Sequence, residues 1–378
     1  MVSLEVSGIA DAAGRQAMAV FPWSVYRGDK NWVPPLIKDR EKQFDPQRNR
    51  FFKQADVALF GARRDGRLVG TIAAFVDRRF NEYLKQRVGF FGFFEVLDDY
   101  EAAEALLGTA RDWVRDRGMT ELRGPLNFHR DRERGVLVSG ADCPPPMLCA
   151  HSPPYYGAFM ERFGLVKHAD DLCRRVLVKQ ILGPNGSLPP RVARLEKVAR
   201  RRSHIVIRHA RFAQLEHELR VVQKLYDATI GQMPDHVPFD EEDIANFARE
   251  LRPVLQEDFA LFGEIDGEPV GCAVAFPDLN QVLFHVNGRL DGWRKLVAWW
   301  YLKRIDILSF KIGGVLETHQ GLGIEALLVL EMAKAALRRG FRWVDLSLNA
   351  EENDKITALT DHFGAEEYKR YRTYKLPL

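Results

Sequence analysis

One segment, THQGLGIEALL (318–328), combines residue types that could bind a phosphate group. Gln320, Gly321 and Gly323 precede a helical pattern; glycines let the backbone approach a ligand closely, and the free N–H groups at a helix start attract phosphate. One interpretation is a dinucleotide fingerprint, because Gly321 and Gly323 begin G-x-G-x-x-A and Asp345 lies 22 residues beyond Gly323. Only 33 residues follow Asp345, too few to finish a doubly wound sheet. A plain glycine turn without a ligand is a second interpretation.

The same segment resembles the coenzyme-A pyrophosphate loop, Q/R-x-x-G-x-G/A, of the GNAT acyltransferase superfamily. The resemblance implies acyl-CoA as cosubstrate, with backbone amides before the loop holding the pantetheine and the loop facing the pyrophosphate. Glu325 departs from the pattern, which has a small residue there, and a carboxylate pointing inward would repel pyrophosphate. The predicted cofactor-binding residues are Gly314, Val315, Leu316, Gln320, Gly321, Gly323 and Asn353, the last at the start of a helix that ends at Gly364.

Acyl transfer to an amine needs a base for the amine and a proton donor for the departing thiolate. Glu317 and His319 lie beside the loop and are the predicted bases. Many members of the superfamily have a tyrosine four residues before the glycine of the last helix, but this sequence has Thr360 there, a poor donor. Tyr371 on the final strand is the predicted acid, with ordinary strand packing as the alternative.

Polar residues that follow strands are the candidates for binding the acceptor. Asn127 and His129 follow a short strand, where ligand-binding groups often gather, although a solvated loop histidine is the alternative. Asp278 and Asn280 follow an apolar strand and could bind the acceptor amine or satisfy the backbone amides of a turn. No metal site is predicted.

The segment 291–310, DGWRKLVAWWYLKRIDILSF, is rich in tryptophan and in cationic residues. Amphipathic aromatic side chains flanked by cations suit a bilayer interface or an acyl chain, so a contact with a membrane surface is predicted here. A buried helix with a basic rim is the alternative.

The elements that must position these residues occur twice, in the order hairpin, strand, helix, strand, helix, strand. Asp65-Gly66 and Asp266-Gly267 mark the two hairpin turns. The predicted elements are 56–77, 88–97, 100–118, 120–124, 154–164 and 173–180 in the first half, and 258–276, 311–317, 324–340, 342–348, 353–364 and 369–376 in the second. We therefore predict an α/β fold with α+β mixed sheets, in two copies of one domain; two unrelated domains that share a hairpin are the alternative.

In the first half, Asp98-Asp99 stands where the phosphate loop is expected, which favours a helix cap over a phosphate site. The resemblance thus implies two tandem GNAT-like domains, the first degenerate. Residues 1–180 are the predicted degenerate domain, 181–190 a Gly- and Pro-containing linker, and 191–378 the acyltransferase domain.

The composition limits the classes of protein to which the chain can belong. The 378 residues are 46% hydrophobic and 28% charged with a net charge of +3, so no domain-wide basic surface for nucleic acid is expected. The four cysteines lack metal-ligand spacing and are predicted to be reduced thiols. No apolar run reaches a membrane-spanning length of about 18 residues, and the N-terminal stretch resembles no signal peptide. A cytoplasmic location, with or without peripheral attachment to the cytoplasmic membrane face, is predicted.

Nearly the whole chain resembles a tandem-GNAT group related to bacterial ceramide synthase. The resemblance rests on FPWSVYRGDKNWVPPL, GFFGFFEVLDD, PPYYGAFMERFG, DLNQ, GIEALL and YKRYRTYKLPL. It implies an acyl-CoA-dependent N-acyltransferase whose acceptor is a sphingoid base or another lipid-like amine. A non-catalytic acyl-thioester or lipid-binding protein of the same fold is the alternative.

Overall fold

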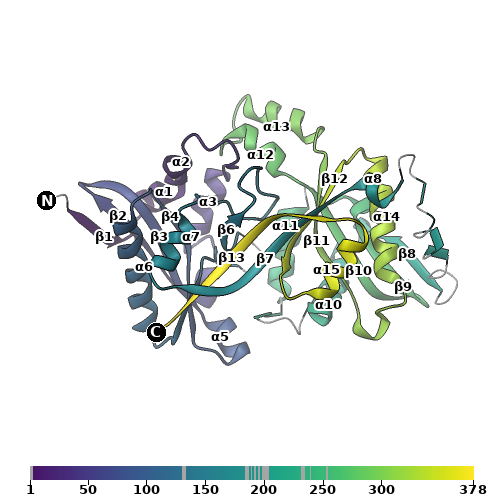
Figure 1. The fold of residues 1–378 in the computed structure, drawn as a ribbon, viewed down its shortest axis with the longest axis horizontal. Helices are drawn as coiled ribbons and strands as arrows, with labels where there is room; N and C mark the ends of the chain where they lie inside the picture. Colours follow the sequence, from purple (N-terminus) through teal and green to yellow (C-terminus); the bar gives the residue numbers. More distant parts are fainter. Residues whose placement is uncertain are drawn as a thin grey trace.

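A continuous mixed β-sheet runs through both halves of the chain in the computed structural model (Figure 1). The structure describes residues 3–129, 133–183, 187–188, 190, 193–194, 196–197, 204–230, 235–238, 240–252 and 254–378. Within these residues the strand order is β1-β2-β3-β4-β5-β13-β7-β12-β11-β10-β9-β8, and β6 pairs with β13. Residues 184–186 and 189 of the predicted linker lie outside the described part, as does most of 191–203.

The first half contributes seven described strands and the helices that cover them. The strands are β1 (Leu4–Gly8), β2 (Ala55–Arg64), β3 (Arg67–Asp77), β4 (Val88–Val96), β5 (Glu121–Gly124), β6 (Val136–Ser139) and β7 (Val166–Leu177). The helices are α1 (Ala12–Val20), α2 (Pro22–Val25), α3 (Ile37–Phe44), α4 (Phe51–Gln54), α5 (Arg78–Leu84), α6 (Tyr100–Arg115), α7 (Tyr156–Arg162) and α8 (Val178–Ile181).

The second half repeats the hairpin, parallel strand pair and connecting helix. Its described strands are β8 (Ile205–His209), β9 (Ala260–Ile265), β10 (Glu268–Pro277), β11 (Ile307–Val315), β12 (Trp343–Ala350) and β13 (Glu366–Pro377). Its described α-helices are α10 (Leu215–Ile230), α11 (Glu241–Leu251), α12 (Asn280–Val286), α13 (Arg294–Leu302), α14 (Ile324–Arg338) and α15 (Asp354–His362). Strand β11 begins at Ile307, four residues before the predicted strand, so the end of segment 291–310 is strand and not helix.

The predicted hairpins are confirmed, and the turn residues explain them. Asp65 and Gly66 have φ angles of 50° and 76°, and Asp266 and Gly267 have 52° and 84°. Left-handed conformations at both central residues match the right-handed twist of the flanking strands, and Asp-Gly adopts them readily. Each hairpin therefore sets the register of one copy.

The two copies share their strands. Strand β13 lies between β5 and β7, and β7 pairs with β12, so the last strand of the chain completes the sheet of the first half. Figure 1 shows β13, in yellow, crossing from one half to the other beside β7. The hydrophobic pattern of a strand does not tell which neighbour it pairs with, and this exchange was not predicted.

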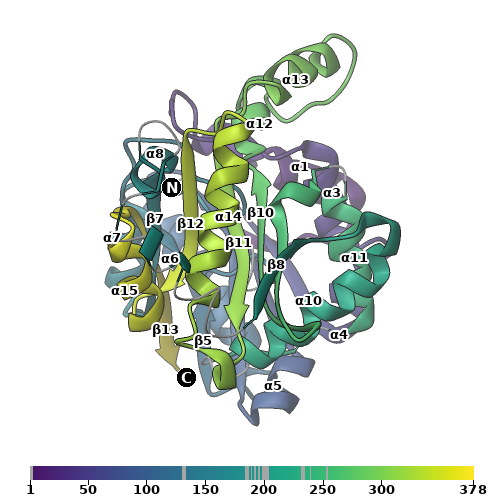
Figure 2. The ribbon, with the colours of Figure 1, turned by 90° about the vertical axis from the view of Figure 1, so that its right-hand side faces the viewer.

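Helices cover both faces of the second half's sheet (Figure 2). Ile324, Leu327 and Leu328 of α14 pack into a core with β9, β10 and β11. Leu225 of α10 packs against Phe262 and Phe276 on the other face. Polar contacts also join the two halves.

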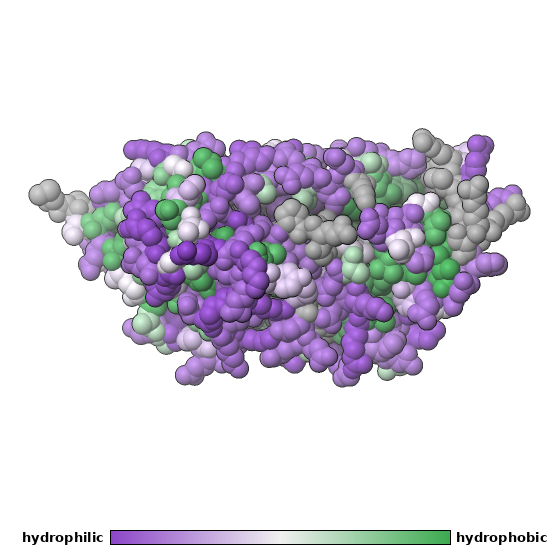
Figure 3. Space-filling view, turned by 90° about the horizontal axis from the view of Figure 1, so that it is seen from below, coloured by the Kyte–Doolittle hydropathy of each residue, from purple (hydrophilic) through white to green (hydrophobic). Residues whose placement is uncertain are grey.

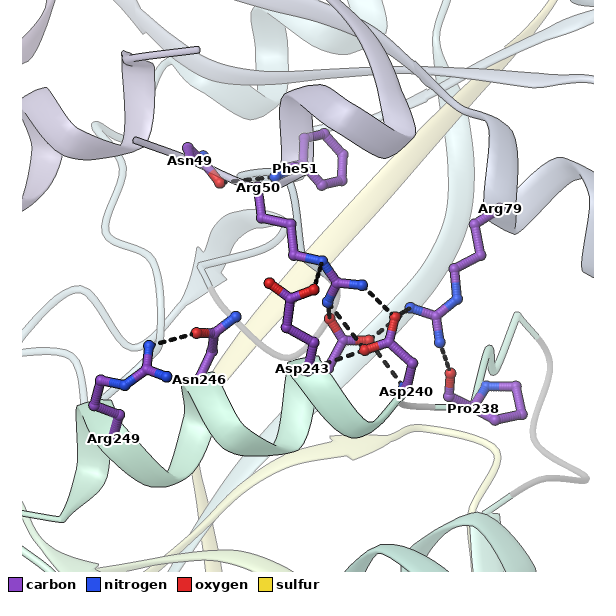
Figure 4. A network of polar contacts seen from close by, with 10 residues as sticks. Asn49, Arg50, Phe51, Arg79, Pro238, Asp240, Asp243, Asn246 and Arg249 are labelled. Carbon is purple, nitrogen blue, oxygen red and sulfur yellow. Dashed lines mark hydrogen bonds and ion pairs between the residues drawn. The ribbon is translucent and has the colours of Figure 1, made fainter. Parts of the chain in front are cut away.

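One such contact network holds α11 against the first half (Figure 4). Arg50 binds Asp240 at 2.5 Å and Asp243 at 2.9 Å, and Arg79 binds Asp243 at 2.6 Å. The hydrogen bond from Arg50 lowers the pKa of Asp240 to about 2. Because the network joins α4 and α5 to the start of α11, it fixes the two halves around the space between them.

Candidate functional site

Strands β11 and β12 separate in the middle of the second half. They pair in parallel from Ile307–Trp343 to Phe310–Leu346, and the described pairing ends there. Between Val274 and Ala275 of β10 the register shifts, so that Lys311 is an extra residue on β11. Beyond this bulge the β12-facing edge of residues 311–315 has no strand partner in the described sheet. Its backbone N–H and C=O groups can therefore pair with an extended ligand.

The predicted phosphate loop lies directly beyond this edge. Gly321 and Gly323 have φ angles of 76° and 93°, which favour glycine, and Gly323 precedes α14 without a side-chain cap. Gln320 donates from Nε2 to the carbonyl oxygen of Val315 at 3.2 Å, which ties the loop to β11. The first N–H groups of α14 are thus presented at the loop, as phosphate binding requires.

A cavity of about 2390 Å³ extends from this loop into the first half. Nine predicted site residues line it: Asn127, His129, Asn280, Gly314, Val315, Gln320, Gly321, Gly323 and Asn353. Five others do not: Asp278, Leu316, Glu317, His319 and Tyr371. Glu325 lines the cavity from the first turn of α14, half-buried. The structure therefore gathers most of the predicted cofactor-binding residues around one space.

The two predicted bases lie in a short 3-10 turn after β11. Glu317 is exposed, and His319 is bonded through Nδ1 to the Thr318 hydroxyl at 2.8 Å. Neither side chain lines the cavity, so their role as bases stays a prediction. Carboxylates that do line the cavity are alternative candidates for the base.

Tyr371 lies fully buried on β13. It packs with Leu137, Cys149 and Cys173, and its hydroxyl has no hydrogen-bond partner in the part of the chain that the structure describes. Burial raises the pKa of Tyr371 well above its usual value, so the hydroxyl stays protonated. Because Cys149 also lines the cavity, the ring of Tyr371 lies just behind its wall.

A buried polar cluster at the bulge was not identified from the sequence. Lys311 donates to Asp345 at 3.3 Å, and Asp345 also accepts from Ser309 at 3.0 Å and from Tyr368 at 2.8 Å. Ser347 bonds the same carboxylate. Burial opposes the charge on Lys311, but Asp345 and neighbouring acidic groups raise its pKa to about 12. The only sequence signal was a charged residue in each of two apolar strands.

Three of the predicted acceptor residues, Asp278, Asn280 and Asn127, form hydrogen bonds with the backbone. Asp278 accepts from the backbone N–H of Asn280 at 2.9 Å, and burial followed by the charge of Asp345 raises its pKa to about 7. Asn280 donates to the carbonyl oxygen of Pro145 at 2.9 Å. Asn127 accepts from the backbone of Phe93 at 2.7 Å. These bonds are those expected of turn- and bulge-holding side chains.

The described residues of the first half form no equivalent opening. Its parallel pair, β4 and β5, also separates, after Phe90–Arg123. The following chain fills the gap, since Leu126 donates to the carbonyl oxygen of Phe91 at 2.8 Å and a Cβ on Gly92 would lie 1.7 Å from the Leu126 oxygen. Asp99 caps α6 at 3.2 Å and binds Arg64, as a cap and not a phosphate loop. The first copy is therefore degenerate, as predicted.

Helix α13 projects from the body of the molecule (Figure 2). Trp293, Leu296 and Trp299 are 63%, 70% and 57% exposed, so the interpretation of a buried helix with a basic rim is wrong. Only its inner side packs, through Ala298 and Tyr301, onto α12. None of the described helices has the length and apolarity needed to cross a bilayer.

Comparison with solved structures defines the class of fold. A tandem GNAT protein from the clavulanic acid biosynthesis pathway superposes with a TM-score of 0.58 at 15% identity, covering 99% of this chain and 98% of that one. The chain thus has the fold of a tandem GNAT protein. No protein-family model matches it.

Two curated proteins resemble it over nearly their full lengths. Bacterial ceramide synthase of Caulobacter vibrioides (strain NA1000 / CB15N) is 30% identical, covering 99% of this chain and 98% of that protein. Protein YghO of Escherichia coli (strain K12) is 29% identical, covering 95% and 92%. The chain belongs to the tandem-GNAT family that includes bacterial ceramide synthase, which confirms the predicted resemblance.

Proposed function

We propose that the protein is an acyl-CoA-dependent N-acyltransferase that works with its second half and acylates a long-chain, lipid-like amine. The observation that carries the proposal is the unpaired edge of β11 running into the Gln320–Gly323 loop, both on one cavity. The membership in a family with a protein named ceramide synthase supports a lipid-like acceptor.

The residues around the cavity fit a coenzyme-A thioester. The free edge at Gly314 and Val315 would hold the pantetheine by strand-like hydrogen bonds, and the loop amides would hold the pyrophosphate. The thioester supplies an activated acyl carbon. The protein places the amine next to it, which contributes much of the rate. The amine nitrogen bonds to the acyl carbon as the carbon–sulfur bond breaks, and the amine proton passes to a base, for which Glu317 and His319 are the predicted residues, directly or through water. Tyr371 is the predicted donor of a proton to the departing thiolate.

The direct test is mass spectrometry after incubation of the full chain with a long-chain acyl-CoA and a panel of amines that includes sphinganine. An N-acyl product that requires both substrates is expected. Binding of acyl-CoA without transfer to any amine would contradict the enzyme proposal and favour a lipid-binding protein. The acyl carrier, coenzyme A or acyl carrier protein, is compared in the same assay.

The loop offers a prediction with a matched control. Gly321→Ala is expected to weaken acyl-CoA binding about tenfold, because φ is 76° and the new Cβ would occupy the space where the pyrophosphate approaches. Gly340→Ala, at the other end of α14, has a φ of 83° and the same open surroundings, so it imposes similar strain away from the loop. Calorimetric titration with acyl-CoA measures both; equal effects of the two variants would contradict the loop assignment.

The same protein is proposed to touch an anionic membrane surface through α13. Lys303 lies 3.7 Å from the ring centre of Trp299, and Arg304 lies 3.2 Å from that of Trp300. Such pairs place apolar rings at the acyl boundary and cations at lipid phosphates. The opposite face of the molecule is mostly hydrophilic, with its apolar side chains in separate groups (Figure 3).

Vesicle co-sedimentation tests this contact. The wild-type protein is expected to sediment with vesicles that contain phosphatidylglycerol more than with phosphatidylcholine alone, and less at high salt. The double variant Trp299→Ala, Trp300→Ala should lose about tenfold in binding, whereas Tyr83→Ala, an exposed tyrosine on α5, should lose none. Unchanged vesicle binding, or a change only in self-association, would overturn the proposal.

A further inference from the structure

A buried lysine lies at the point where β11 and β12 separate. Lys311 is the extra residue of the β11 bulge, and it directly follows the last described pair of the two strands, Phe310–Leu346. Its side chain reaches across to β12, where Nζ lies 3.3 Å from a carboxylate oxygen of Asp345 and 3.4 Å from the backbone oxygen of Ser347. The ammonium group therefore lies between the two strands where their pairing ends.

The hydrogen bonds of this ammonium group are incomplete. An ammonium group has three N–H donors, and the described part of the chain gives Lys311 two acceptors, Asp345 and the Ser347 backbone. Both bonds are longer than the usual limit of about 3.2 Å for N–H donors to oxygen. The Lys311 side chain is 9% exposed and lines the cavity. One N–H is therefore left for an acceptor that enters the cavity.

The surroundings of Lys311 keep it charged. The titratable groups that face its ammonium group are Asp345, Cys149, Cys173 and Asp278. Burial opposes the charge, but these groups, Asp345 first, raise the pKa of Lys311 to about 12. Burial also raises the pKa of Asp278 to about 7, so Asp345 is the main counter-charge, and its carboxylate also accepts hydrogen bonds from three hydroxyl groups. Lys311 is therefore a cation near neutral pH.

Lys311 also lies at one end of the edge that is proposed to hold the pantetheine. The unpaired edge of β11 runs from Lys311 to Val315, about 13 Å of extended strand, and Gln320 of the loop bonds the backbone of Val315. The loop and Lys311 are thus at opposite ends of this edge. A thioester with its pyrophosphate at the loop and its pantetheine along the edge would have its acyl carbon at the Lys311 end.

Tyr371, the predicted proton donor, lies beside the same group of side chains. It packs with Cys149 and Cys173, which also face Lys311. Cys149 lines the cavity, as Lys311 does. A cationic donor and a neutral donor therefore lie around the same end of the proposed thioester site.

Acyl transfer from a thioester produces negative charge on two atoms in turn. As the amine nitrogen forms its bond to the acyl carbon, the electron pair of the carbonyl double bond moves to the oxygen. As the carbon–sulfur bond breaks, the double bond forms again and the sulfur leaves with the bonding pair. The amine proton passes to a base, and the thiolate takes up a proton. A donor that is already aimed at the carbonyl oxygen lowers the barrier of the first step, and a charged donor binds an oxyanion more strongly than a neutral one.

We propose that Lys311 is the oxyanion-stabilising residue of the second half: its third N–H binds the carbonyl oxygen of the thioester and the negative charge that forms on it. Asp345 is a positioning residue, which holds the ammonium group where β11 and β12 separate. The inference rests on the proposed function and adds a catalytic residue to it.

Binding of two coenzyme-A derivatives tests the site without any reaction. S-carboxymethyl-coenzyme A carries a negative oxygen near the sulfur, and S-carbamoylmethyl-coenzyme A is its neutral counterpart of equal size. Calorimetric titration of the full chain is expected to show about tenfold tighter binding of the carboxymethyl derivative, the value of a hydrogen bond between charged groups. Lys311→Met should lose this preference. Lys334→Met, which removes an ion-paired lysine of α14 that does not line the cavity, is the matched control and should keep it.

Equal binding of the two derivatives by the wild type, or a preference that Lys311→Met retains, would overturn the proposal. A preference that depends on Lys311 in a protein that transfers no acyl group would support the oxyanion site and refute the proposed function. The two proposals therefore fail separately.

Kinetics separate the catalytic role from a purely structural one. Lys311→Met is expected to lower kcat about 100-fold, the usual effect of removing an oxyanion donor, with little change in KM for acyl-CoA. The double variant Asp345→Leu, Lys311→Met leaves no unpaired carboxylate in the strands, so its free energy of unfolding should exceed that of Lys311→Met while kcat stays low. Recovery of kcat together with stability in the double variant would show that Lys311 only balances Asp345, and would overturn the proposal.

Discussion

Tyr371→Phe is expected to lower kcat for amide formation about 100-fold while KM for acyl-CoA and the free energy of unfolding stay nearly constant. General acids contribute rate factors of about this size. The hydroxyl of Tyr371 has no partner in the described part of the chain, so its removal leaves no polar group unsatisfied. A buried hydroxyl without a partner costs its desolvation free energy. Phenylalanine removes that cost and preserves the packing against Leu137, Cys149 and Cys173, so it should not lower the free energy of unfolding.

Tyr374→Phe is the matched control for this prediction. Tyr374 lies on the same strand, is equally buried and bonds Glu161 at 3.5 Å, within the core of the first half. Steady-state kinetics and urea unfolding of the two variants separate the roles. A Tyr371→Phe enzyme with wild-type kcat, or the same loss in both variants, would refute Tyr371 as the proton donor.

The sequence predicted the helices and strands better than it predicted which strands pair with each other. The Asp-Gly turns, the helix after the glycine loop and the cap at Asp99 are local features, and each forms where expected. The order of the strands is not local. A strand such as β13 has a buried side whichever neighbour it pairs with, so its insertion between β5 and β7 left no sequence signal.

The candidate site likewise contains residues that the sequence predicts from local spacing and residues that it does not. The loop residues follow a spacing that backbone geometry demands, and they line the cavity together. Lys311 and Asp345 are single charged residues in two apolar strands, and they lie 34 residues apart in the chain. Only the folded arrangement brings the two together. Similarly, the exposure of α13 depends on what packs against it, which a pattern of tryptophans and cations leaves open.

Asp345→Ala is expected to lower the free energy of unfolding by about 3–5 kcal/mol, the usual cost of leaving a buried charge without its partner. Asp345 is 1% exposed and accepts from Lys311, Ser309, Ser347 and Tyr368. Alanine would therefore leave a buried ammonium group and three hydroxyl donors without their partner. Since small domains unfold with about 5–15 kcal/mol, such a loss would be plain in urea unfolding.

The double variant Asp345→Leu, Lys311→Met decides whether the pair as such matters for stability. Replacing both partners by apolar residues of similar size removes the stranded charge, so the double variant should be more stable than Asp345→Ala by more than 1 kcal/mol. Asp258→Ala, which removes the partially exposed partner of Arg339 in the same half, is the control and should cost less than about 1 kcal/mol. A double variant that is no more stable than Asp345→Ala would contradict this expectation. The hydrogen bonds to Ser309 and Tyr368, and not the charge of Lys311, would then account for the lost stability. The buried ion pair would not stabilise β11 and β12 at the point where they separate.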